Sequence, residues 1–374
     1  MSMSCLYNPS RLKNARLMAK LSLDELAGKL GELGLPLTKQ ALSKYENGDL
    51  NPSSYIIDGV ARILMKPVTY FTKGEVLDLG DVDYRIVKSR FSSKDRASIL
   101  ALAGDYFERY MQLEELTGLR MAHQSRLPHR IAVSNELDAE NAALKMRRHW
   151  NLGDRPIASI VKLFENDGIK LYRIPSHEGF DAFVASPEGD LVMCFATIQQ
   201  PDDSGPGGRR LDLPRMRFNL VHELAHAILD FSPEILADER QLERLCHVFS
   251  GNFLMPSTAL KRALGEERRS RMNIRELIDV KQEYGISLKA LGMRMLQCEL
   301  LTQAAYRSFS IFYNMKKYGR TVNEPGRFIG DERPKRFDSM IGDALLNQQI
   351  NYNVASVLTE SDVEIVKEKY ALLG

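Results

Sequence analysis

The chain has 374 residues, of which 44% are hydrophobic and 27% are charged, a composition typical of a globular protein with two or three domains. The formal net charge of +2 excludes a globally basic nucleic-acid-binding protein, so any nucleic-acid contact must come from a local patch. The four cysteines are scattered, and no apolar run approaches membrane-spanning length. We therefore expect a cytoplasmic protein that makes no membrane contact and has no disulfide framework.

The first 75 residues have apolar positions at helical spacing, which predicts four short helices. Ser22 with Glu25 forms a capping box for a second helix over 23–30, and Thr38 caps a third helix over 39–46. Pro52 opens a fourth helix that runs to residue 64. A helix, a turn and a polar helix in this order are the plan of a helix-turn-helix domain.

This segment resembles the Xre/Cro-type repressor domains over roughly residues 8–72. The resemblance rests on residues 11–16, 22–27 and 41–48, although the turn before the third helix is longer than usual. It implies that double-stranded DNA is a partner, contacted through residues 8–72. The residues that the resemblance turns towards DNA are Thr38, Lys39, Gln40, Ser43 and Lys44.

The local charge agrees with a DNA-binding role. Residues 1–74 contain ten Lys or Arg and six Asp or Glu, and this positive excess favours contact with phosphates. The alternative is a helical module that serves only dimerisation or partner contact, and the sequence leaves a homodimer open. A connector over 76–130 follows, with one long helix expected over 94–121.

Residues 131–300 alternate between helical and strand patterns and predict a domain with a small sheet. Helices are expected over 135–150 and 157–165, and strands over 169–174, 181–185 and 191–196. The polar, Gly/Pro-rich segment 199–213 is expected to be a loop before the next helix. The last region, 301–374, is expected to hold helices over 339–348, 354–358 and 361–370, and it could be a sensor, a dimer element or a lid.

The helix expected over 216–229 contains the motif His-Glu-x-x-His. His222 and His226 are four residues apart, so they lie on one face and can bind one metal ion. Glu223 lies beside them and can act as a general base towards water whose pKa the metal lowers. The alternative is a pair of core histidines on a buried helix.

A catalytic zinc site needs a third protein ligand. Five residues that could supply it follow on the next helix, which is expected over 236–253, or just before it. The spacing alone does not choose among them. These residues are Glu234, Asp238, Glu239, Glu243 and His247.

Segments 217–226 and 243–256 together resemble the ImmA/IrrE family of metallopeptidases, which cleave repressors of the Xre type. The resemblance implies a zincin-like fold with Glu243 as the third ligand, as in gluzincins, and Glu223 as the catalytic base. It also implies that His247 is a catalytic residue that supports the ligands or stabilises the developing oxyanion. Cys246 replaces the alanine usual in the family. The expected metal is Zn²⁺, with Mn²⁺ as the alternative.

The sequence thus predicts an α+β, mainly helical protein with four parts: a DNA-binding domain (1–75), a connector (76–130), a zincin-like peptidase (131–300) and a helical end (301–374). The predicted function is that of a DNA-binding zinc metalloendopeptidase that cuts a repressor-type protein, in trans or in its own chain. One rival is a transcriptional regulator or antitoxin whose peptidase-like domain senses or binds without cleaving. Another is a structural zinc domain, which would favour four protein ligands.

Overall fold

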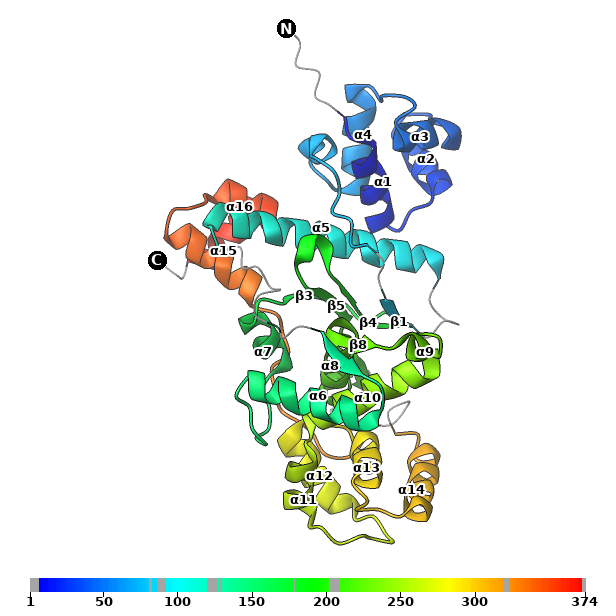
Figure 1. Ribbon diagram of the computed structural model, residues 1–374. Coiled ribbons are helices and arrows are strands. Elements are labelled where there is room, and N and C mark those ends of the chain that lie inside the picture. Colours follow the sequence, from blue (N-terminus) through cyan, green and yellow to red (C-terminus); the bar gives the residue numbers. More distant parts are fainter. Residues whose placement is uncertain are drawn as a thin grey trace. The chain divides into compact units, whose positions relative to one another are not determined.

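The computed structural model describes residues 7–80, 83–86, 92–119, 127, 130–177, 179–201, 209–318 and 323–371. The chain divides into two compact units. Unit 1 contains Met1–Gly80, Val87–Arg120 and Met340–Gly374, and unit 2 contains Asp81–Ile86 and Met121–Ser339. The predicted α+β, mainly helical class is confirmed (Figure 1).

Unit 1 begins with the four expected helices, and their caps follow from the sequence. Ser22 and Glu25 form the capping box, and the Thr38 hydroxyl accepts a hydrogen bond from the backbone N–H of Ala41. The fourth helix begins after Ser53 rather than at Pro52, because the Ser53 side chain provides its N-cap. The helices are α1 (Pro9–Met18), α2 (Leu23–Glu32), α3 (Lys39–Asn47) and α4 (Ser54–Leu64), followed by the 3-10 helix η1 (Val68–Thr72).

The rest of unit 1 comes from the connector and from the far end of the sequence. The long helix α5 (Ser93–Thr117) packs against α1 and ends at Gly118, whose positive φ suits a helix C-terminus. Helix α16 (Tyr352–Thr359) also packs against α5 (Figure 1). The last helices are α15 (Arg336–Leu346), which begins in unit 2, α16 (Tyr352–Thr359) and α17 (Val363–Tyr370).

Partly buried charges join these segments of unit 1. The Arg11 guanidinium of α1 lies 2.8 Å from the Glu108 carboxylate of α5. Lys66, which follows α4, approaches Asp105 of α5 (3.5 Å) and Glu360 at the end of α16. The Lys66 and Asp105 side chains are 8% and 4% exposed, so water screens this contact only weakly.

The main sheet of unit 2 has the strand order β1-β4-β5-β3. Strands β3 (Lys170–Ile174) and β5 (Val192–Ala196) are parallel, and β4 (Phe180–Ala185) is antiparallel to β5. The fourth strand, β1 (Asp83–Ile86), pairs antiparallel with β4 on its other edge. The two small sheets join β2 (Ile131–Val133) to β8 (Leu229–Phe231), and β6 (Gln199–Pro201) to β7 (Arg209–Leu211).

One hydrophobic core of unit 2 takes residues from this sheet, from α6 (Glu136–His149), α7 (Ile160–Asn166), α8 (Leu213–Ile228) and α10 (Glu239–Leu254), and from the helices that follow. The expected loop over 199–213 is partly a strand pair, and its residues 202–208 lie outside the described residues. Among the described residues, no helix is both long and apolar enough to cross a membrane. The helices of unit 2 are α6 (Glu136–His149), α7 (Ile160–Asn166), α8 (Leu213–Ile228), α9 (Pro233–Leu236), α10 (Glu239–Leu254), α11 (Ser257–Leu264), α12 (Ile274–Tyr284), α13 (Leu288–Gln297) and α14 (Gln303–Met315).

Candidate metal centre and DNA-contact helix

Helix α8 carries the His-Glu-x-x-His motif through the middle of unit 2. Pro214 in its first turn is suited to a helix start, and apolar side chains follow on nearly every face. Within it, His222 is fully buried and Glu223 is 1% exposed, while His226 is partly exposed. The buried site lowers the local dielectric and strengthens every charge interaction at these residues.

Helix α10 packs against α8 and supplies the acidic partner. We predicted one helix from residue 236, and that start is wrong. The short helix α9 ends at Leu236, and the Asp238 side chain then caps α10 by accepting hydrogen bonds from the N–H groups of Arg240 and Gln241. This new start places Glu243 in the second turn of α10, where its carboxylate reaches the histidines of α8.

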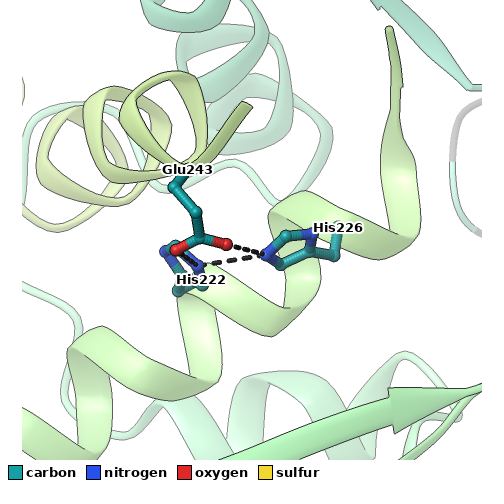
Figure 2. Close-up of side chains that lie close together, drawn as sticks. All are labelled: His222, His226 and Glu243. Atoms are coloured by element: carbon teal, nitrogen blue, oxygen red, sulfur yellow. Dashed lines mark hydrogen bonds and ion pairs between the residues drawn. The ribbon is translucent and has the colours of Figure 1, made fainter. Parts of the chain in front are cut away.

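The side chains of His222, His226 and Glu243 lie close together and form the group called the metal triangle here (Figure 2). The two Nε2 atoms of His222 and His226 are 3.1 Å apart. The carboxylate oxygens of Glu243 lie 3.3 Å from Nε2 of His222 and 3.2 Å from Nε2 of His226. Among the described residues, these three form the one group of His, Cys, Asp or Glu arranged to hold a metal ion.

The distances between these ligand atoms match those expected around a zinc ion. Tetrahedral zinc with bonds of about 2.0–2.1 Å places neighbouring ligand atoms about 3.3–3.4 Å apart. The observed contacts are close to that spacing: 3.1 Å between the two Nε2 atoms, 3.3 Å from Oε2 of Glu243 to His222, and 3.2 Å from Oε1 of Glu243 to His226. The other candidates from the sequence, Glu234, Asp238, Glu239 and His247, are not part of the triangle.

The charges around the triangle also favour a shared cation. Burial alone lowers the pKa of His226, but hydrogen bonding to Cys246 and Glu243 outweighs it and raises that pKa to about 11. Burial alone raises the pKa of Glu243, but hydrogen bonds from His222 and His226 bring it well below its usual range. A proton therefore occupies this position in the metal-free protein at neutral pH, and a metal ion must displace it.

Zinc binding to the metal-free protein at about pH 7.5 is expected to release about one proton. The pKa of His226 is raised to about 11, so the imidazole is protonated below that pH and must become neutral to bind zinc. Zinc affinity should therefore rise about tenfold per pH unit in the neutral range. Calorimetry in two buffers of different protonation enthalpy measures the release, and Glu239→Ala on the same helix is the control. Binding without proton release would contradict the charge assignment.

Two further residues adjoin the metal triangle. The ring of His247 lies 4.8 Å from that of His222 and 5.8 Å from that of Phe218, measured between centroids. Its exposed side chain is thus a neighbour of a ligand rather than a member of the triangle, and its catalytic role stays a prediction. Cys246 is buried and interacts with His226, a contact that the sequence did not indicate.

A buried ion pair anchors α8 one turn before the ligands. Arg217 and Glu332 have fully buried side chains, and a guanidinium N–H of Arg217 donates to the carboxylate at 2.5 Å. The same carboxylate accepts hydrogen bonds from the N–H groups of Ile160 and Val161 at the start of α7. An arginine among the apolar residues of a buried helix could have signalled a buried acidic partner, but the sequence did not identify it.

The five residues expected to contact DNA lie at the start and along one side of α3. Lys39, Gln40 and Lys44 are exposed, and Ser43 is partly exposed. Thr38 is exposed and its hydroxyl also caps the helix, while the Lys39 ammonium lies 2.8 Å from the Asp24 carboxylate. Gln40 and Lys44 are four residues apart and therefore share a face that solvent can reach.

Lys44→Ala is expected to weaken binding to a mixed-sequence DNA duplex and to reduce the slope of log K against log salt by about 1. The reason is that an exposed ammonium on the face expected to contact DNA would release one counterion from a phosphate. Lys29→Ala, in the last turn of α2, is the matched control. Fluorescence anisotropy at several salt concentrations measures both variants, and equal slopes for Lys44→Ala and the wild type would remove Lys44 from the interface.

Comparison with known families agrees with these two regions. Residues 12–71 match the family model described as Helix-turn-helix. Residues 208–296 match a peptidase family model described as the IrrE N-terminal-like domain, and this range includes the whole metal triangle. No curated protein matches the chain. The expected fusion of an Xre-like helix-turn-helix to an IrrE-like peptidase domain is confirmed.

Proposed function

We propose that this DNA-binding regulator is a zinc-dependent metalloendopeptidase that hydrolyses a peptide bond in a repressor-type protein, either another chain or its own. The triangle of His222, His226 and Glu243 is the observation that carries the proposal. Three protein ligands are the number that catalytic zinc sites use, whereas structural sites are closed by four. Mn²⁺ is the alternative metal.

A zinc ion at this triangle would polarise the peptide carbonyl and lower the pKa of a water molecule. Glu223 follows His222 on α8 and interacts electrostatically with His226, which supports a place for its carboxylate in the proposed site. In the proposed mechanism, Glu223 takes a proton from water and returns it to the leaving amine. His247 would support the ring of His222 or stabilise the oxyanion.

The proposed substrate class rests on the presence of both domains in one chain. An Xre-like domain and an IrrE-like peptidase domain are present together. Segments 217–226 and 243–256 resemble the ImmA/IrrE family, whose members cut Xre-type repressors. A helix-turn-helix in the same chain could bring the peptidase to DNA-bound repressors or present a substrate in cis. The competing function is a regulator or antitoxin that binds a partner without cleaving it.

The test uses the full-length protein, purified metal-free and reloaded with zinc alone. Incubation with and without double-stranded DNA, followed by mass spectrometry of the intact protein, detects new termini. We expect fragments that are absent when Glu223→Gln replaces the wild type. The same assay with an Xre-type repressor as the added protein tests cleavage in trans. If neither gives fragments under any of these conditions, the binding-only function replaces the peptidase.

A further inference from the structure

In the sequence, a short segment of unit 2 lies between two parts of unit 1. Residues up to Gly80 belong to unit 1, the described residues Asp83–Ile86 belong to unit 2, and the described residues from Ser92 to Leu119 belong to unit 1 again. The segment Asp83–Ile86 forms β1, the edge strand of the main sheet. A segment that joins the DNA-binding helices to α5 thus completes a sheet of the peptidase-like unit.

Strand β1 is added to β4 in antiparallel register. Tyr84 is opposite Phe183 and Arg85 is opposite Ala182, and an irregularity after Arg85 interrupts the regular pairing. Without β1, the strand β4 would be the edge of the sheet, because its other neighbour is β5. Adding a strand to an exposed sheet edge is also the way in which many proteins bind an extended peptide.

The edge that β1 covers belongs to the strand packed on the metal helix. Helix α8 packs against β4, and a guanidinium nitrogen of Arg215 in its first turn lies 2.9 Å from both carboxylate oxygens of Asp181 in β4. Ala182 of β4 shares a hydrophobic core with Leu220 and Leu224 of α8. A peptide paired with this edge would therefore run beside the helix that carries the metal triangle.

We propose that Asp83–Ile86 occupies the edge of β4 on which the peptidase site binds extended substrates, so that this segment holds the site closed. The inference rests on the proposed function, because it names the occupant of that same site. The backbone pairing supports this proposal, because an antiparallel strand from the same chain covers the edge of β4, the strand that packs against α8. A tethered strand competes at an effective concentration of about millimolar, so a peptide added at micromolar concentration is excluded.

Two proline variants test the proposal. Successive residues of an edge strand direct their N–H groups alternately towards the neighbouring strand and away from it. Proline removes that N–H, so only one of Tyr84→Pro and Arg85→Pro breaks the pairing with β4, and the other is its matched control. Tyr84→Ala and Arg85→Ala control for loss of the side chains. All are made in the Glu223→Gln background, so that binding is measured without cleavage.

The probe is a fluorescein-labelled peptide with the sequence of residues 81–91. We expect one proline variant to bind it at least about tenfold more tightly than the other variants, because the edge is no longer occupied. A second readout is the visible spectrum of the cobalt-substituted protein, which should change on adding peptide to that variant alone. Circular dichroism and hydrogen exchange of the β4 amides establish that each variant is folded.

Equal affinity for all folded variants would overturn the proposal, and so would tighter binding that leaves the cobalt spectrum unchanged. If one proline variant does not fold, the wild type mixed with peptide at millimolar concentration provides the same cobalt readout, and an unchanged spectrum there also counts against it. These measurements need no cleavage, so their failure is distinct from failure of the peptidase assay. A chain that cuts no protein can still show peptide-dependent cobalt spectra.

Discussion

Glu223→Gln is expected to bind zinc as tightly as the wild type and to cleave its substrate at least about 100-fold more slowly, the lower end of what a positioned general base contributes. Glutamine has nearly the same shape as glutamate but accepts no proton at neutral pH. Because Glu223 is not one of the three residues of the metal triangle, the substitution leaves the zinc ligands in place. Metal analysis measures the zinc content, and fragment formation by mass spectrometry measures the rate.

Two other variants serve as comparisons for Glu223→Gln. His226→Ala removes a vertex of the triangle and should lose zinc and cleavage together. Glu239→Gln changes an exposed carboxylate on α10 and should lose neither. Cleavage by Glu223→Gln at the wild-type rate would show that another group takes the proton. Loss of zinc in Glu223→Gln would instead show that Glu223 supports the ligands.

Glu332→Ala is expected to lower the free energy of unfolding of unit 2 by about 3–5 kcal/mol, because it leaves the Arg217 guanidinium buried without its carboxylate. Both side chains are fully buried, so water cannot replace the lost partner. The start of α7 loses the acceptor for two backbone N–H groups as well. The single tryptophan, Trp150, belongs to unit 2, and its fluorescence during urea unfolding measures the effect.

The double variant Arg217→Met with Glu332→Leu should recover part of that loss, because it leaves no lone buried charge. Asp331→Asn is the exposed control, since the Arg333 guanidinium that pairs with it is largely in solvent. A loss in Glu332→Ala no larger than in this control would mean that the ion pair contributes nothing. Zinc content measured on the same samples shows whether the anchor on α8 also positions the metal ligands.

Short-range signals in the sequence predicted most helices well. The capping serine and threonine of α2 and α3 act within three residues, so their effect is visible in a linear pattern. The pairing of His222 with His226 is equally local, since helical periodicity alone puts both on one face. The position of Glu243 required the packing of α10 on α8, and spacing left it among five candidates.

Long-range pairings were not predictable from the pattern. Glu332 pairs with Arg217 across 115 residues of sequence, and the residues around each of them give no indication of the other partner. Strand β1 has only four residues and follows a polar linker, so its pairing with β4 depends on the sheet edge available to it. The predicted helical end at 301–374 likewise carried no sign that residues from 340 onwards belong with the first helices.

That last arrangement has a consequence for biosynthesis. The core of the helix-turn-helix is complete once residue 71 has left the ribosome. Glu360, the partner of Lys66, emerges only after the whole peptidase-like unit has been translated. The nascent DNA-binding helices therefore form their contacts with α16 only after the peptidase-like unit has been translated, and unit 1 reaches its final stability only then.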